Sequence, residues 1–230
     1  MKIKYHFILL ALAFICLQNC ASTKVIDSWK AEPSVVDLFK TKKVLVIART
    51  ANENARYSFE REIADALRNK GINAVESYSK APTIHAEREM SEERLAMIKS
   101  LMDSEGFTAV VLTVIKDKKE TVRTTSSGLY VGASYGAYYP GYYGGFYNYY
   151  NHPYAYGSYY DSFGGYIPMS SSTRVETDYV LETVAYNLDA PEENQLVGVV
   201  TTSMEDPRDA YKSAAKYVEL MIESLETPKK

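Results

Sequence analysis

The stretch Phe107-Thr-Ala-Val-Val-Leu-Thr-Val-Ile115 is the strongest strand signal in the chain, because apolar and β-branched residues fill almost all of it. Two other segments predict further strands. Lys43-Val-Leu-Val-Ile-Ala48 is a short apolar run of the length of a buried strand. Residues 72–78 alternate between apolar and polar side chains, which favours a strand with one buried face.

Helical patterns occupy the two intervals between these strands. Residues 55–70 carry apolar residues at the spacing of one helix face, and Gly71 supplies a C-terminal stop. A second helix is expected after Ser91, a residue that can act as N-cap. The order strand–helix–strand–helix–strand predicts a parallel α/β core with right-handed crossovers. The two apolar stripes consist of Phe59, Ile63, Ala66 and Leu67, and of Leu95, Ile98, Leu101 and Met102.

The second half of the chain carries a different pattern. Residues 173–188 alternate between polar and apolar, and residues 195–203 return as another strand after a turn, so the two are expected to pair as a hairpin. Asp206 and Pro207 predict the start of a last helix, with Asp206 as N-cap. The sequence thus predicts a single α/β domain with a mixed five-stranded sheet in the order β-α-β-α-β-β-β-α, three helices and a long loop insertion rich in tyrosine and glycine.

Residues 128–166 form this insertion and separate the first part of the domain, 43–127, from the second part, 167–230. The insert holds 14 of the 21 tyrosines and 9 of the 12 glycines. So many glycines leave no helical or strand period, and a long surface loop is expected. It is either a low-complexity spacer or an adhesive surface, since tyrosine offers a flat apolar face and a hydroxyl at low entropic cost. The candidate binding residues are Tyr138, Tyr139, Tyr142, Tyr143, Tyr149 and Tyr150.

The first twenty residues are typical of a bacterial lipoprotein signal. Lys2 and Lys4 supply a positive start, and residues 7–17 are all apolar, a run that fits a signal-peptide core and is too short to span a bilayer. The stretch Leu17-Gln-Asn-Cys20 resembles a lipobox. Residues 1–19 are therefore expected to be removed as a signal peptide, and Cys20 is the expected lipidation site, through which acyl chains hold the protein on the membrane.

The segment that follows the signal, residues 20–42, is expected to be the lipid anchor and a tether. Polar and helix-breaking residues such as Ser28 and Pro33 interrupt any periodicity in it. Trp29, the only tryptophan, lies in this segment. Its large ring is expected either to dock on the domain or to lie at the membrane interface.

The composition argues against several classes of function. The net charge of −3 speaks against nucleic-acid binding, which depends on basic surface. Once the signal is removed, His85 and His152 are the only histidines, and they stand too far apart in sequence to predict a metal site; no cofactor is expected. Ser134 matches a G-x-S-x-G motif, but it lacks the strand before it and the helix directly after it that the motif needs. The chain is therefore interpreted as a non-enzyme without catalytic residues.

Charged residues elsewhere fit solvent-facing surfaces. Arg56 and Glu60 stand four residues apart on the first helix, which is the spacing of an exposed ion pair. A basic patch after the third strand is either a solvated strand end or a contact for anionic lipid heads or glycans. This patch consists of Lys116, Lys118, Lys119 and Arg123.

Several stretches together carry a resemblance of pattern: Val44-Leu45-Val46-Ile47, Arg56, Phe59-Glu60, Leu67, Gly71-Ile72-Asn73-Ala74, Thr177–Leu188 and Gln195–Ser203. The pattern resembles a family of small bacterial cell-envelope lipoproteins of unknown function. The domain of that family is similar to those of the curli secretion lipoprotein and of the lipoprotein that activates penicillin-binding proteins. The resemblance carries no catalytic motif, so it assigns no site residue.

The expected protein is a non-enzymatic lipoprotein of the outer membrane that faces the periplasm; Ala21, and not Asp, after Cys20 is compatible with sorting to that membrane in lipoproteins generally. It would act as a binding or assembly component of the cell envelope, with the membrane, through the lipid anchor, and an envelope protein or glycan as its partners. The alternative is a glycan- or peptidoglycan-binding module that uses the tyrosine-rich loop.

Substitution Cys20→Ala tests the lipid anchor. Because the thiol of Cys20 is the expected acylation site, the variant is expected to move from the membrane fraction to the soluble periplasmic fraction. Cell fractionation shows where the protein is found, and mass spectrometry of the mature N-terminus shows whether Cys20 is modified. An unmodified Cys20 in the membrane-bound protein would contradict the assignment.

Overall fold

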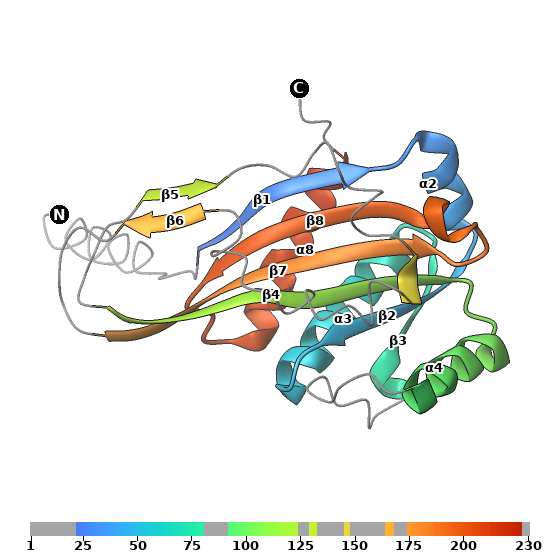
Figure 1. Cartoon of the computed structure of the whole chain (residues 1–230), viewed down its shortest axis with the longest axis horizontal. Coiled ribbons are helices and arrows are strands. Elements are labelled where there is room, and N and C mark those ends of the chain that lie inside the picture. The colour runs from blue at the N-terminus through green and yellow to red at the C-terminus, as the bar shows by residue number, and fades with distance from the viewer. Residues whose placement is uncertain are drawn as a thin grey trace, which may run out of the picture.

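The computed structural model describes residues 22–80, 92–123, 129–132, 145–147, 164–167 and 174–226. Within these ranges the chain forms a six-stranded mixed sheet in the order β1-β8-β7-β4-β2-β3, with helices on both faces (Figure 1). The strands are β1 (Thr23–Lys30), β2 (Lys43–Arg49), β3 (Asn73–Glu76), β4 (Ala109–Arg123), β7 (Arg174–Asn187) and β8 (Leu196–Glu205). The helices are α2 (Pro33–Lys40), α3 (Glu53–Asn69), α4 (Glu92–Glu105) and α8 (Ala210–Glu226). Two 3-10 turns, η1 (Ser77–Ser79) and η3 (Glu192–Asn194), and a two-stranded sheet of β5 (Leu129–Gly132) and β6 (Gly164–Ile167) complete the described elements.

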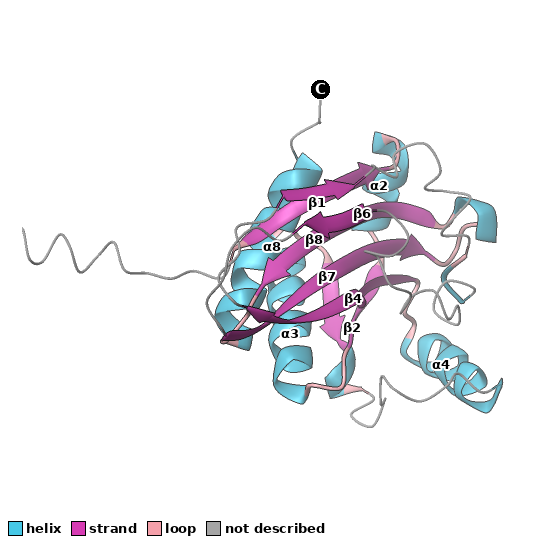
Figure 2. Ribbon diagram, turned by 60° about the vertical axis from the view of Figure 1, so that its left-hand side comes forward, coloured by secondary structure: helices cyan, strands magenta, loops and turns pink. Residues whose placement is uncertain are grey.

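The parallel α/β core is confirmed. β2 runs parallel to both of its neighbours, β3 and β4. The chain passes from β2 through α3 to β3, and from β3 through α4 to β4. Because the two crossovers run in opposite directions along the sheet and keep the same hand, they place α3 on one face and α4 on the other (Figure 2). β7 and β8 form the expected antiparallel hairpin on the other side of β4.

The N-terminal edge of the sheet differs from the prediction. Residues 23–30 form β1, which pairs antiparallel with β8, and residues 33–40 form α2, so residues 20–42 are not a tether throughout. The predicted five strands and three helices are therefore wrong, since the described residues form six strands of the main sheet and four α-helices. Ser28 is held in the strand opposite Val200, and Pro33 lies at the start of α2, where its missing N–H is not needed.

Trp29 lies within this added strand. It packs against the buried cluster on the α4 side of the sheet. Of the two alternatives for its ring, docking on the domain is the one that the structure shows. The ring therefore helps to hold the edge strand on the sheet.

The last helix starts later than expected. Asp209, and not Asp206, caps α8: its Oδ1 accepts from the backbone N–H of Lys212 at 3.0 Å, and its carbonyl accepts from Ser213 N at 2.9 Å. Asp206 instead lies in the turn between β8 and α8 and has a φ of 42°, a region that non-glycine residues rarely adopt. An Asp-Pro pair that suits a helix start is used here to shape a turn.

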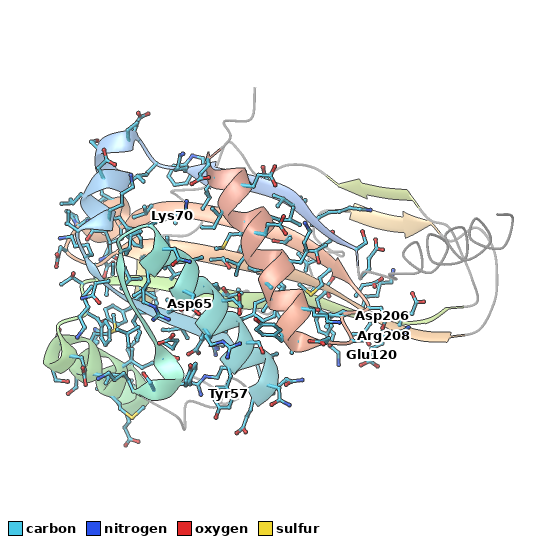
Figure 3. The ribbon with its side chains drawn as sticks, turned by 180° about the vertical axis from the view of Figure 1, so that it is seen from behind. Tyr57, Asp65, Lys70, Glu120, Asp206 and Arg208 are labelled. Atoms are coloured by element: carbon cyan, nitrogen blue, oxygen red, sulfur yellow. The ribbon has the colours of Figure 1, made fainter. Side chains whose placement is uncertain are left out.

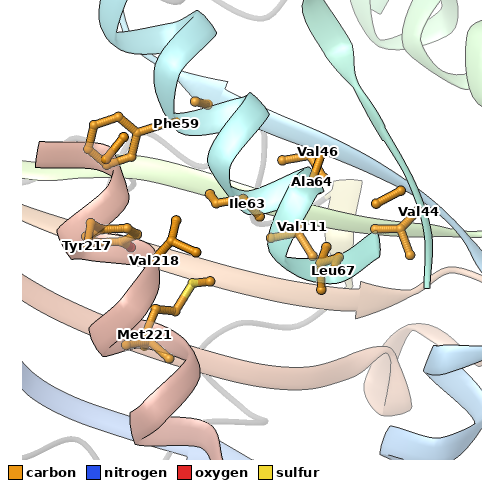
Figure 4. Close-up of a cluster of buried hydrophobic side chains, with 14 of the residues drawn as sticks. Val44, Val46, Phe59, Ile63, Ala64, Leu67, Val111, Tyr217, Val218 and Met221 are labelled. Atoms are coloured by element: carbon orange, nitrogen blue, oxygen red, sulfur yellow. The ribbon is translucent and has the colours of Figure 1, made fainter. Parts of the chain in front are cut away.

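Apolar side chains fill both faces of the sheet. One cluster lies between the sheet and the helices α3 and α8; it includes Phe59, Ile63, Val111, Tyr217 and Met221 (Figure 4). The other lies on the α4 side. Its buried members include Leu45, Ile98, Met102, Leu112 and Tyr186.

The insert is not a surface loop throughout, contrary to the prediction from its composition: its residues 129–132 and 164–167 pair as β5 and β6, and Phe146, with Tyr147 packed beside it, joins this second cluster. Phe146 is fully buried, and its ring lies 5.8 Å from that of Tyr186. The backbone N–H of Phe146 donates to Oε1 of Gln195 at 2.9 Å, and Nε2 of Gln195 donates to the carbonyl of Ala190 at 3.1 Å. Local sequence conceals this residue because glycines and tyrosines surround it. Replacement of the whole insert by a Gly/Ser linker would therefore remove part of the core.

The Arg56–Glu60 pair is also not a solvent-facing pair. Glu60 is fully buried and Arg56 is only 6 % exposed. Oε1 of Glu60 accepts from Nε of Arg56 at 3.0 Å and from Ser77 Oγ at 2.7 Å. It also accepts from the backbone N–H of Ala48 at 3.1 Å, while Oε2 accepts from that of Tyr78 at 2.8 Å. One carboxylate thus joins the end of β2, helix α3 and the turn after β3.

Substitution Glu60→Gln is expected to lower the free energy of unfolding by about 3–5 kcal/mol, because it removes the buried carboxylate charge that pairs with the Arg56 guanidinium. The matched control is Glu62→Gln on the same helix, which removes a surface pair with Arg61 at 3.7 Å and is expected to cost less than about 1 kcal/mol. Urea unfolding measures both variants. Equal losses of unfolding free energy in the two variants would show that the buried Glu60–Arg56 pair contributes no more than the surface pair.

Candidate functional site

A cleft lies at the carboxyl end of β2 and beside residues 113–118 of β4, where the parallel pairing of these two strands ends. It is bounded by the first turns of α3 and α8 and by the turn that precedes α8, and its volume is about 670 Å³. Its floor includes Thr113, Leu181 and Met204. In open α/β sheets the carboxyl ends of parallel strands are where ligands bind, so we take this cleft as the candidate site.

Local sequence explains why both helices begin at the cleft. Oδ1 of Asn52 accepts from the backbone N–H of Ala55 at 3.0 Å and caps α3, as expected for an asparagine at this position. Oγ1 of Thr50 accepts from the backbone N–H of Asn52 at 3.2 Å and holds the turn that leads into the helix. Asp209 caps α8 in the same way. The positive ends of two seventeen-residue helices therefore meet at one place.

Three cationic side chains line the cleft, and each comes from a different element. Arg49 is the last residue of β2, Lys118 lies on β4, and Arg208 lies in the turn before α8. None of the described residues that line the cleft carries a carboxylate. The cleft therefore presents positive charge on polar walls above an apolar floor.

The acids nearest to these cations lie outside the lining. Nε and Nη2 of Arg208 both donate to Oδ2 of Asp206, at 2.9 and 2.7 Å. Lys118 pairs with Glu120 at 2.7 Å, and this hydrogen bond raises the pKa of Lys118. Figure 3 shows Asp206, Arg208 and Glu120 together at the start of α8. The two acids orient the cations at the rim of the cleft.

The inner wall of the cleft is a partition built on Tyr217. Its ring packs on Phe59, with centroids 5.2 Å apart. Its hydroxyl and that of Thr183 lie 2.6 Å apart, and Thr183 Oγ1 lies 2.6 Å from Oγ1 of Thr113, which lines the cleft. Burial raises the pKa of Tyr217 to about 12. The partition thus contains a chain of neutral hydroxyls between the polar cleft and the apolar core.

The structure does not describe the residues that the sequence predicted as sites. Cys20, Ser134 and the six candidate tyrosines, Tyr138, Tyr139, Tyr142, Tyr143, Tyr149 and Tyr150, lie outside the described residues. Tyr147, a described tyrosine of the insert, is half-buried against Phe146, with the ammonium group of Lys99 4.8 Å from its ring centroid. In the described part of the chain no group of three or more His, Cys, Asp or Glu side chains could hold a metal ion.

The predicted basic patch is divided by the sheet. Lys118 lines the cleft, but Lys116 is 4 % exposed and lies 3.4 Å from the buried Glu182. The four-residue patch is therefore not one surface. Arg49 and Arg208 were not expected in a site, since each is an isolated cation in sequence and only the packing of β2 against the α8 turn joins them.

Comparisons with known proteins leave the family open. No protein-family model matches the chain, and no curated protein matches it in sequence. Its structure is similar to that of PelC from Paraburkholderia phytofirmans, a dodecamer, with a TM-score of 0.41 and 11% identity over 91% of this chain and 100% of that one. A variant of PelC gives a TM-score of 0.37, also at 11% identity, over 88% of this chain and 96% of the other. Likeness at this level carries no argument about function. Among the described residues, no helix is long and apolar enough to cross a membrane.

The raised pKa of Tyr217 predicts a loss of stability in alkali. The folded pKa of about 12 lies above the ordinary value of 10.0, so the unfolded chain releases this proton first as the pH rises. The contribution is fully present below pH 10 and is lost between about pH 10 and 12, with a total of about 3 kcal/mol.

Urea unfolding of the unaltered chain and of Tyr217→Phe, measured across that pH range, isolates the effect of the Tyr217 hydroxyl. The variant is expected to be less stable at pH 7 by about 1 kcal/mol, since it loses the hydroxyl contacts, and to decline less steeply in alkali. Equal slopes for the two proteins would show that Tyr217 is not the titrating group.

Proposed function

We propose that this chain is a non-enzymatic lipoprotein of the outer membrane that acts by binding an envelope partner. In this proposal it is anchored through Cys20, faces the periplasm, and holds an acidic group of its partner in the cleft. The observation that carries the proposal is the lining of the cleft: cations from three separate elements and, among the described lining residues, no carboxylate.

Electrostatics favours an anionic ligand at this place. Two helix N-termini and three cationic side chains all stabilise negative charge, and a partly enclosed cleft strengthens such interactions relative to open solvent. Arg49 is only 9 % exposed, so its charge lies where the effective dielectric constant is lower than in water. Carboxylates on peptides or on glycans have the charge and the acceptor oxygens that such a cleft suits.

The apolar floor adds a second contact. Met204 and Leu181 lie below the cations, so a ligand that carries an acidic group beside an apolar or sugar surface meets both parts of the cleft. A binding component that recognises acidic peptides or glycans of the envelope fits this arrangement. The alternative, glycan binding through the tyrosine-rich insert, is a separate proposal that makes the opposite prediction about charge.

The test is a crosslinked pull-down from intact envelopes with the double variant Lys118→Gln and Arg208→Gln. Because both cations lie at the cleft, recovery of the partner is expected to fall at least about tenfold, and raised salt is expected to weaken capture by the unaltered chain. Lys119→Gln is the control, since it removes a neighbouring positive charge that does not line the cleft.

A second variant separates the two proposals. It replaces four tyrosines of the insert by serine: Tyr138, Tyr139, Tyr142 and Tyr143. If the cleft is the site, this variant is expected to capture the partner as well as the unaltered chain does. Capture that survives the cation variant and high salt, and is lost with the tyrosines, would overturn the cleft proposal and favour the insert.

A further inference from the structure

A second hollow lies on the same face of the sheet, at the other end of α3 and α8. It has a volume of about 230 Å³ and lies between α2, the C-terminal halves of α3 and α8, and the strands β4, β7 and β8. Its walls are almost entirely aliphatic or aromatic, with Phe39, Ile63, Leu67 and Met221 among them. The Tyr217 partition separates it from the cleft, because Thr183 lines this hollow while Thr113 lines the cleft.

Two small residues in the sheet account for the hollow. Ala185 of β7 and Gly198 of β8 are paired directly across the two strands. Val111 lies opposite Ala185 on one side, and Lys30 lies opposite Gly198 on the other. A Cβ added at Gly198 would meet only the carbonyl oxygen of Trp29 at 3.4 Å and Leu225 Cδ2 at 3.8 Å. The three helices that lie over this row therefore leave space that larger side chains would fill.

An apolar space of this size suits an apolar guest and not water. Water needs two or more polar partners, and an apolar cavity of about 150 Å³ already stays dry and binds a small hydrocarbon. Because the hollow is open at one side, between α2 and the ends of α3 and α8, a longer guest can enter from its end.

Lysine side chains gather at the mouth of the hollow, where the negative ends of α2, α3 and α8 favour cations. Lys30, Lys40 and Lys70 line it, with Glu226 as the one carboxylate among the described lining residues. Lys70 pairs with Glu226, and Lys40 pairs with Asp37 at 2.8 Å. Lys30 donates to the carbonyl of Leu225 and forms no ion pair with a described carboxylate, although its charge also helps to lower the pKa of Glu226, so Lys30 is the lysine of the mouth best placed to meet an anionic head group. Figure 3 shows Lys70 where α3 approaches α2.

We propose that this hollow binds the alkyl chain of a free fatty acid, with the carboxylate held at the lysine-lined mouth beside Lys30. The apolar walls exclude a charged ligand from the interior, and the lysines favour an anionic head over a neutral one. We take the ligand to be a free fatty acid and not the chain's own anchor, because β1 begins at Thr23, opposite Met204 of the cleft, and reaches the hollow only at Lys30, roughly 23 Å away at the spacing of a strand. This site is independent of the proposed cleft function.

Calorimetric titration of the purified Cys20→Ala chain with octanoate, decanoate and dodecanoate tests the proposal. This variant carries no acyl chain that could compete. Affinity is expected to rise about fourfold for each added methylene, until the hollow is full and the gain levels off. Failure of all three acids to bind would overturn the proposal, and would leave the cleft proposal untouched because that test uses different residues.

Filling the hollow is the sharpest test of its location. Ala185→Leu is expected to weaken dodecanoate binding by at least about tenfold, because the larger side chain occupies the space above β7. Ala96→Leu, the same change on the exposed face of α4, is expected to bind dodecanoate normally. A folded Ala185→Leu protein with unchanged affinity would overturn the assignment.

Gly198→Ala is the variant to use if Ala185→Leu does not unfold cooperatively. Its single added methyl group is expected to make the gain in affinity level off at a shorter acid than in the unaltered chain. A gain that levels off at the same acid in both proteins would overturn the proposal.

The head group is tested with Lys30→Gln against Lys24→Gln, at the two ends of β1. Lys30→Gln is expected to weaken dodecanoate binding by up to about fivefold and to leave dodecanol binding unchanged. Lys24→Gln is expected to alter neither. Equal affinity of the unaltered chain for dodecanol and dodecanoate would overturn the assignment of a fatty acid.

Discussion

The buried carboxylate of Glu60 is the constraint on which the arrangement around the cleft depends. A carboxylate without solvent is tolerated only when charge and hydrogen bonds replace its hydration, and Glu60 receives donors from Arg56, Ser77 and two backbone amides. These donors belong to β2, α3 and the turn after β3. One charged group therefore sets the positions of these three elements relative to one another. It also sets the edge of the cleft, because Arg49 directly follows Ala48.

The space between the sheet and its two long helices is divided by a second constraint. Phe59 and Tyr217 meet near the middle of α3 and α8, and the Tyr217 hydroxyl needs partners because it is fully buried. Thr183 supplies the hydroxyl that contacts it, and Thr113 on the neighbouring strand in turn contacts Thr183. The result is a polar, cationic cleft where both helices begin and an apolar hollow where both end.

These two spaces differ in chemistry because different parts of the same elements line them. Helix starts, turns and strand ends bring polar and charged residues to the cleft, whereas helix interiors and paired strands bring aliphatic residues to the hollow. An acidic group and an alkyl chain are the ligand classes that suit them. A protein held at a membrane through Cys20, as we propose, would meet both classes in the cell envelope.

The sequence alone determined the α/β class, the parallel core and the β7–β8 hairpin, because hydrophobic periodicity is local and survives in the fold. It did not determine β1, whose strand pairing depends on the open edge of β8, nor the burial of Phe146, whose neighbours are glycines and tyrosines. Arg56 and Glu60 have the same spacing whether an ion pair is exposed or buried, so only packing decided between the two. The cleft and the hollow join residues from distant parts of the chain, and such proximity exists only once the sheet and helices have packed.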